Sequence, residues 1–135
     1  MLALTQAIYG KLPGSALETA INGRLFEDIA EDGAQYPYAV YSVVGSPKEK
    51  TFTEVFRNTL AEFVIFSNSS SATEIKTIYS YLSALYDECR LALSPNTFYR
   101  MYETNMTLNA EKIETTSGGD IIRTCFVEFE ILTEV

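Results

Sequence analysis

The residues best suited to chemistry in this chain are two glutamates near its end, in the segment GDIIRTCFVEFEILTEV. Glu128 and Glu130 are two residues apart, and the positions between and around them are apolar: Cys125, Val127, Phe129 and Ile131. Alternate residues of a β-strand share a face, so the two carboxylates lie side by side. Paired carboxylates are the catalytic groups of glycoside hydrolases, which also need a cleft lined with aromatic residues and one raised pKa. Two glutamates on one strand more often form a solvated acidic surface, and we expect that here.

Other polar clusters give weaker signals. Asp87 and Glu88 are adjacent on an expected helix, so their carboxylates diverge and form a polar face instead of a metal site. The motif SGGD has no following Lys-Ser/Thr, which makes it a hairpin turn and not a phosphate cradle. The motif SNSSSAT could hold an anion at a helix start, but its own serines suffice to cap the free N–H groups.

The two cysteines, Cys89 and Cys125, are expected to be small buried hydrophobic residues and not a disulfide or a nucleophile. The chain has no His, which is the commonest activating base and metal ligand. The sequence therefore predicts no catalytic residue, no cofactor and no metal. One alternative stays open, a small-ligand site between helix and sheet with Tyr79, Tyr86 or Tyr102 as polar handles.

Length and charge limit the class of protein. A chain of 135 residues with 47% hydrophobic residues forms one domain, residues 1–135. The net charge of −8 should repel phosphates, so sequence-specific nucleic-acid binding is not expected. There is no run of about 18 apolar residues, so no membrane segment is expected. The N-terminus has no basic start, which indicates synthesis in the cytoplasm and not a signal peptide.

The first part of the chain predicts two helices followed by strands. A helix over residues 2–12 is stopped by Pro and Gly, and a second helix covers residues 15–23. Ser15 and Glu18 have the spacing of a capping box at the start of this second helix, and Asn-Gly ends it. The strands that follow are expected at residues 24–30, 38–44 and 52–66, with GSPKEK as an exposed connection before the last of them.

The strongest pattern is an amphipathic helix of about six turns over residues 70–93, ended by Ser-Pro-Asn, since Pro95 cannot continue a helix. Ser71 and Glu74 again have capping-box spacing. Its apolar stripe consists of Ile75, Ile78, Tyr79, Leu82, Leu85, Tyr86, Cys89 and Leu93. A strand over residues 97–108, a polar loop at 111–120 and the terminal strand complete the chain.

This order of elements predicts an α+β fold: a largely antiparallel β-sheet packed on one face by the long amphipathic helix and the N-terminal helices. The apolar side of the terminal strand is expected to lie under the long helix, with Cys125 facing Cys89. The strands carry more aromatic residues than one helical layer can cover, and these fall on both faces: Tyr36, Tyr38, Tyr41, Phe56, Phe63, Tyr99, Tyr102 and Phe126. Scattered surface aromatics can be without meaning, but this surplus favours self-association.

The order and spacing of these elements resemble the tail completion, or tail terminator, proteins of tailed bacteriophages and prophages. The resemblance runs from the N-terminal helix through INGRLFEDIAEDGAQYPYAVYSVV and LAEFVIFSNSSSATEIKTIYSYLSAL to TTSGGDIIRTCFVEFEILTEV. The matching positions of the first of these segments are Gly23, Arg24, Gly33, Pro37, Tyr38, Val40 and Tyr41. The segment GSPKEKTFTEVF, which is more basic than its surroundings, and the high tyrosine content depart from the family pattern.

The resemblance implies a structural virion protein without catalytic residues, located in the tail or neck and assembled in the cytoplasm of the host bacterium. Its implied partners are copies of itself in a ring, typically a hexamer, the tail tube protein and the head connector or neck proteins. DNA would pass through the ring. From the Glu128/Glu130 face and the net charge of −8 we expect an acidic sheet face or loop near its lumen. A head-side neck adaptor or stopper protein is the alternative. The candidate interface residues are Tyr38, Tyr41, Lys48, Lys50, Phe52, Phe56, Tyr102, Phe126, Glu128 and Glu130.

Overall fold

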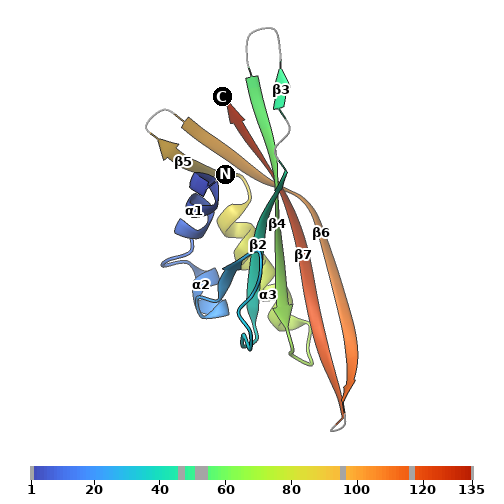
Figure 1. Cartoon of the computed structure of the whole chain (residues 1–135). Coiled ribbons are helices and arrows are strands. Elements are labelled where there is room, and N and C mark those ends of the chain that lie inside the picture. The colour runs from blue at the N-terminus through green and yellow to red at the C-terminus, as the bar shows by residue number, and fades with distance from the viewer. Residues whose placement is uncertain (1, 46–47, 51–54, 95–96, 116–117, 135) are drawn as a thin grey trace.

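A computed structural model describes residues 2–45, 48–50, 55–94, 97–115 and 118–134. Its elements, in chain order, are α1 (Leu2–Gly10), α2 (Ala16–Ile21), β1 (Leu25–Glu27), β2 (Tyr38–Gly45), β3 (Lys48–Lys50), β4 (Val55–Ser67), α3 (Thr73–Tyr86), β5 (Cys89–Ser94), β6 (Thr97–Thr115) and β7 (Gly118–Glu134). Figure 1 shows the helices gathered beside a strongly twisted sheet. Within the described residues, no helix is long and apolar enough to cross a bilayer.

The strands form one sheet of seven, in the order β1-β2-β4-β7-β6-β5, with β3 paired to β4 outside that path. The pair β1–β2 is parallel. The other pairings are antiparallel, and those of β4 and β6 with β7 are the longest. This confirms the predicted α+β fold with a largely antiparallel sheet.

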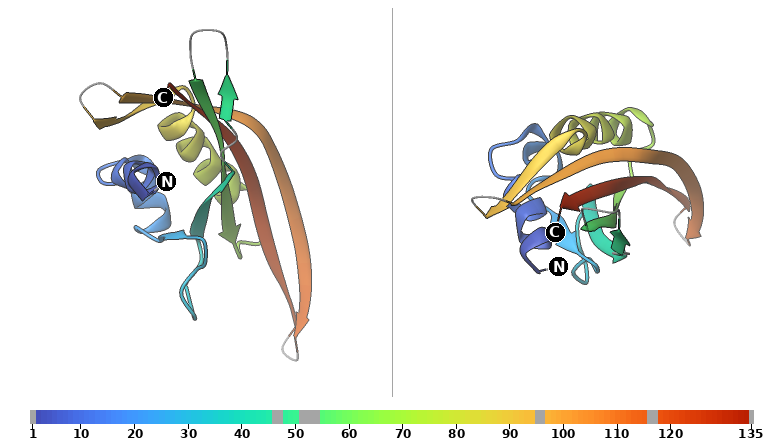
Figure 2. Two further views of the ribbon diagram at one scale, coloured as in Figure 1. Left: turned by 45° about the horizontal axis from the view of Figure 1, so that its top comes forward. Right: turned by 90° about the horizontal axis from the view of Figure 1, so that it is seen from above.

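The core lies between the helices and one face of this sheet, called the inner face below. Helices α1, α2 and α3 contribute one cluster with alternate residues of β2, β4 and β7. On β7 four successive inner residues are fully buried: Cys125, Val127, Phe129 and Ile131. The terminal strand therefore places its apolar side under the helices, as its alternation predicts, and Figure 2 shows α3 running along that side of the sheet.

Helix α2 begins and ends as its sequence predicts. The backbone N–H of Glu18 donates to Oγ of Ser15 at 3.1 Å, and the Glu18 carboxylate accepts from the N–H of Gly14 at 3.2 Å. Asn22 has φ 53° and Gly23 has φ 73°, so two left-handed residues end the helix. Because these signals act within four residues, the sequence alone carries them.

Helix α3 is shorter than predicted, since it ends at Tyr86 and not at residue 93. Asp87 closes the last turn by donating its N–H to the Ser83 carbonyl at 2.8 Å, and Glu88 turns the chain with φ 57°. Residues 89–94 then form β5, which pairs with β6 through Cys89 and Met101. The segment CRLAL fits both a helical and a strand pattern. Because β6 offers an unpaired edge with free backbone N–H and C=O groups, the segment forms a strand there.

The start of α3 also differs from the capping-box prediction. Its N-cap residue is Ala72, which has no side-chain capping bond. Glu74 accepts a hydrogen bond from Oγ of Ser67 at 2.7 Å instead of reaching back along its own helix. Ser71 bonds to Thr73, from side chain to side chain at 2.9 Å.

Two segments predicted as connections are strands. Residues 111–115 and 118–120 continue the β6–β7 pairing down to Thr115 opposite Gly118. In GSPKEK, Lys48–Lys50 forms β3 against β4. Ladder hydrogen bonds join backbone groups, so polar residues extend a hairpin whose register is already fixed. Figure 1 shows the β6–β7 ribbon reaching well beyond the helices.

Candidate assembly surface

The sheet face opposite the helices, called the outer face below, carries the remaining alternate residues. By register these are Phe26 on β1, Tyr38, Val40 and Ser42 on β2, Leu60, Glu62, Val64 and Phe66 on β4, Phe126, Glu128, Glu130 and Leu132 on β7, and Tyr102 on β6. Leu60, Leu132 and Phe126 are exposed, and 36% of Phe126 is accessible. Among the described residues the helices pack against the inner face, so these three exposed side chains are open to a partner.

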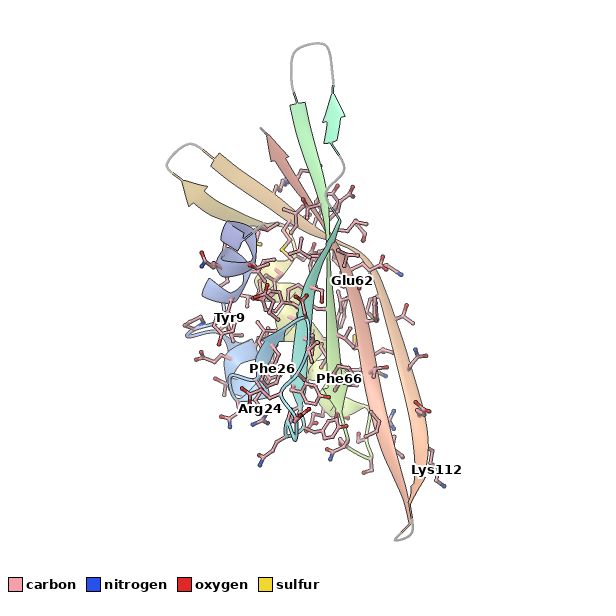
Figure 3. The ribbon with its side chains drawn as sticks, in the orientation of Figure 1. Tyr9, Arg24, Phe26, Glu62, Phe66 and Lys112 are labelled. Carbon is pink, nitrogen blue, oxygen red and sulfur yellow. The ribbon has the colours of Figure 1, made fainter. Side chains whose placement is uncertain are left out.

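One end of the outer face is aromatic. The ring of Tyr38 stacks on Phe66 with centroids 4.8 Å apart and meets Phe26 edge-on at 6.0 Å. Tyr36 lies 5.3 Å from Tyr38 in a tilted arrangement. These rings come from β1, β2, β4 and the loop before β2, and Figure 3 shows Phe26 and Phe66 near one another. By packing against one another, the four rings remove part of their own surface from water.

The middle of the outer face is acidic. Glu62 and Glu128 are directly opposite partners on β4 and β7, and Glu130 follows two residues later on the same face as Glu128. Like charges directly opposite one another on a sheet destabilise it. Tyr102 donates its hydroxyl to Oε2 of Glu130 at 2.8 Å. The predicted acidic face of Glu128 and Glu130 therefore exists and is larger than predicted.

Glu62 is the residue of this face that sequence reasoning missed. It lies in LAEFVIF, where apolar residues on both sides hide the alternation. Ala61, Phe63 and Ile65, its neighbours along β4, are buried on the inner face. Glu62 alternates with them and therefore lies on the outer face. A stricter count of period-two positions in this segment could have found it.

A hollow of about 300 Å³ lies on the outer face beside the loop that follows β1. It is lined by Asp28, Ile29, Ala30, Tyr38, Val40, Ser42, Glu62, Val64 and Phe66. Asp28 turns the chain with φ 61° and donates its N–H to the Tyr41 carbonyl at 2.9 Å. Ile29, on the rim, is 83% exposed. The hollow is thus apolar inside, with two carboxylate residues in its lining.

Two arginines brace the loops next to this face. Arg24 donates from Nε to the Pro37 carbonyl at 3.0 Å and from Nη2 to the Tyr36 carbonyl at 3.3 Å. Arg123 donates from Nε to the Ser69 carbonyl at 3.2 Å and from Nη2 to the Ser70 carbonyl at 2.9 Å. Each guanidinium donates to two carbonyls of one loop, so each arginine holds the conformation of that loop.

The ten candidate interface residues fall into three groups: those on the outer face, those outside the described residues, and Tyr41, which is discussed next. Five of them lie on the outer face: Tyr38, Tyr102, Phe126, Glu128 and Glu130. The Phe52 position and the side chains of Lys48, Lys50 and Phe56 lie outside the described residues.

Tyr41 is a correction to the predicted interface. It is 2% exposed, on the inner face, and its hydroxyl donates to the Thr5 carbonyl at 3.3 Å. Burial raises its pKa to about 12, with smaller contributions from nearby acidic groups. Phe63, counted among the surplus aromatics, is likewise fully buried. The aromatic surplus is therefore smaller than the sequence suggests, since these two rings pack against the helices.

The three tyrosines considered as ligand handles do not converge on one cavity. Tyr86 is fully buried and donates to the Ile8 carbonyl at 2.7 Å. Tyr79 donates to Oε2 of Glu103 at 2.7 Å, and that bond, followed by burial, raises the Tyr79 pKa to about 12. Tyr102 lies on the opposite face of the sheet. Each hydroxyl serves an internal contact.

Both cysteines are free thiols. Cys125 is fully buried, and burial, followed by the charge of Glu103, raises its pKa to about 11. Cys89 begins β5 instead of extending α3, and it is only partly buried. Burial is also the main cause that raises the pKa of Cys89. Because the thiolate is the nucleophile, a raised pKa lowers the reactivity of both thiols at neutral pH.

Comparison with known proteins finds a match of the fold and none of the sequence. No protein-family model matches the chain, and no curated protein matches it. Among solved structures, a chain from the virion of a native gene transfer agent particle shares the fold with a TM-score of 0.63 and 14% sequence identity. The match covers 98% of this chain and 95% of that chain.

Proposed function

We propose that this protein is a structural component of a phage-type virion, namely a tail terminator that forms a ring at the head-proximal end of the tail tube. The observation that carries the proposal is the fold shared, end to end, with a chain of the gene transfer agent virion. At 14% identity that likeness concerns the fold, and the order of motifs in the sequence points to the tail completion family.

The outer face supports self-assembly. Leu60, Phe126 and Leu132 are exposed on a sheet surface that no described helix covers. Apolar and aromatic side chains framed by charged residues are typical of protein–protein interfaces. A second copy, or a tail tube subunit, would bury these side chains and repay the cost of exposing them to water.

The acidic row supports a passage for DNA. Glu128 and Glu130 share the outer face, and in a ring we place them toward the lumen, where they repel the phosphate backbone. Such a bore lets DNA slide without being held. A ring whose bore is lined by Lys and Arg would contradict this placement.

The proposed role needs no catalytic step. Its action is to bind the end of the tube, stop its growth and offer a docking surface to the head connector.

Imaging with and without tail tubes tests the proposal. We expect rings in negative-stain micrographs and, when the protein is present during tube polymerisation, tubes of fixed length with a ring at one end. Light scattering of the purified protein should show an oligomer. A protein that leaves tube length unchanged and binds the isolated head connector would instead be a head-side neck adaptor, which is the second candidate.

A further inference from the structure

We infer that copies of this chain associate side by side, with an acidic loop of one copy docking in a basic pocket of the next, which rests on the self-assembly part of the proposed function. The acidic loop is residues 27–33, which begin at the end of β1 and carry Ile29. The basic pocket lies between the start of α3 and the inner face of β6. Its lining includes Ala72, Ile75, Lys76, Leu108, Ala110 and Arg123.

The acidic loop presents one apolar side chain among carboxylates. Ile29 is 83% exposed, more than any other large apolar side chain among the described residues. The acidic residues around it are also exposed: Glu27, Asp28, Glu31 and Asp32. Water is an unfavourable environment for an isoleucine, and a negative surrounding repels acidic partners. The loop therefore suits a partner surface that is apolar at its centre and basic at its border.

Hydrogen bonds hold the acidic loop in one conformation. Asp28 donates its N–H to the Tyr41 carbonyl at 2.9 Å, and Ala34 donates its N–H to the Glu31 carbonyl at 3.1 Å. Arg24 binds two carbonyls in the residues that follow, just before β2. Because these bonds exist in the single chain, docking costs little loop entropy.

The basic pocket has the complementary chemistry. Its volume is about 280 Å³, and its apolar lining includes Leu108, which is 38% exposed. Lys76, which is exposed, and Arg123 supply positive charge, and no described residue of the lining is acidic. Two bonds from Arg123 to the loop before α3 hold its guanidinium in place. The pocket thus offers an apolar site for Ile29 and two cations for the carboxylates around it.

The two surfaces do not meet within one chain. The sheet order places β4 and β7 between β2, next to the acidic loop, and β6, which lines the pocket. Three steps of about 4.8 Å make a separation of about 14 Å. Ile29 also borders the outer-face hollow, whereas Leu108 lies on the inner face, opposite Cys125. Figure 1 shows β2 and β6 on opposite sides of β4 and β7, so a second copy must provide the loop.

This docking joins two different surfaces, so it is heterologous and continues from copy to copy. The acidic loop lies toward the β1 end of the sheet and the pocket toward the β6 end, which places neighbouring copies side by side. If the rotation per copy closes, the product is a ring, as the proposed function requires. Neither surface includes Glu128 or Glu130, so both glutamates stay available for the lumen.

Crosslinking between copies tests which surfaces meet. A chain with Ile29→Cys, mixed with a chain carrying Leu108→Cys and oxidised mildly with copper phenanthroline, should give a covalent dimer, because docking brings the two positions within disulfide range. Ala110→Cys is a second partner position in the same pocket. Each variant alone should crosslink no more than the wild-type protein, whose two free cysteines set the background. Tyr9→Cys, 46% exposed on α1, is the matched control and should not crosslink to Leu108→Cys.

Charge exchange tests the same contact without oxidation. We expect Glu31→Lys and Lys76→Glu each to weaken self-association at least about tenfold in sedimentation velocity, because each places like charges in contact. An equimolar mixture of the two variants should recover association, since each loop then meets a pocket of opposite charge. Ile29→Ser should also weaken association, because it removes the apolar group that docks.

The controls separate folding from docking. Lys76 lies near the start of α3, where an acidic side chain favours the helix, so loss of association in Lys76→Glu cannot come from a weakened helix. Lys11→Glu makes the same charge change after α1, away from the pocket, and should leave association unchanged. Circular dichroism verifies that every variant is folded.

The outcomes distinguish the two proposals. If the wild-type protein forms rings but the mixed cysteine variants do not crosslink above background, or if mixing the charge variants fails to restore association, the loop docking is wrong and the tail terminator proposal stands. If the wild-type protein stays monomeric at all concentrations and also on tail tubes, self-assembly is overturned and the docking falls with it.

Discussion

The hydroxyl of Tyr86, at the end of α3, donates a 2.7 Å hydrogen bond to the carbonyl oxygen of Ile8 in α1. The Tyr86 ring is fully buried and lies 4.8 Å from the ring of Phe63 and 6.3 Å from that of Phe129. One side chain therefore joins the N-terminal helix, the long helix and two central strands. This contact adds a hydrogen bond to the burial of Leu4 and Ile8, which packs α1 against the core.

Replacing Tyr86 by Phe should lower the free energy of unfolding by about 1 kcal/mol, because it removes one buried hydrogen bond and keeps the ring. The Ile8 carbonyl still accepts from the Lys11 N–H at 3.3 Å, which limits the loss. Urea unfolding followed by circular dichroism measures it. Tyr81→Phe, at an exposed position of the same helix, should change nothing. Equal effects of both variants would contradict the role of this bond.

Alkaline pH should destabilise the protein through Cys125. Its folded pKa, about 11, lies above the ordinary value of 9.0, so the fold favours the protonated thiol. That stability is fully present below about pH 9 and is lost as pH rises through about 11, with a slope of up to about 1.4 kcal/mol per pH unit. Urea unfolding at pH 7, 9, 10 and 11 measures the slope.

The matching variant is Cys125→Ala, which should lower stability at pH 7 and remove the Cys125 contribution to the slope, most visibly between pH 9 and 10. Above pH 10 Tyr41 and Tyr79, whose pKa values are raised to about 12, and Tyr86, whose pKa burial raises further, add a decline in both proteins. An unchanged slope in the variant would show that the Cys125 thiol does not couple to folding.

Phe126→Asp should abolish assembly and leave the fold intact. The ring lies on the outer face and is 36% exposed, so a carboxylate there meets water in the monomer and an apolar surface in the assembly. Light scattering and circular dichroism measure the two properties. Phe129→Asp, at a fully buried position three residues later, should unfold the protein instead. Loss of folding in Phe126→Asp would place that ring in the core.

Arg24→Ala should loosen the loop that borders the hollow. Its guanidinium donates to the carbonyls of Pro37 and Tyr36, and their loss should lower stability by about 1 kcal/mol. A glutamate-specific protease should then cut faster after Glu31. Arg123→Ala removes the same number of bonds from the other loop, at Ser69 and Ser70, and should leave the Glu31 cut unchanged. Equal cleavage rates in both variants would contradict the bracing role of Arg24.

Prediction from sequence succeeded where the signal was local. The cap of α2 at Ser15, its end at Asn22 and the alternation of β7 depend on residues at most four apart, and the structure confirms each. The acidic parity of Glu128 and Glu130 follows from the same alternation. These features do not need knowledge of any distant partner.

Prediction failed where two local patterns were equally satisfied. Residues 89–94 fit the end of a helix and also a strand, and pairing with β6 made them β5. The polar residues 111–120 have the pattern of a loop. In the structure, β6 and β7 are already paired over the preceding residues, and the same register continues through the described part of this segment.

The amino-acid sequence by itself determined the class of fold, the helix caps and the faces of the strands, because periodicity and capping act between near neighbours. Only the tertiary structure decided that Tyr41 is internal, that Glu62 joins Glu128, and that Asp28 and Ile29 border a hollow. These depend on which strands lie side by side. Strand pairing joins residues far apart in the chain, and no short stretch of sequence contains both partners.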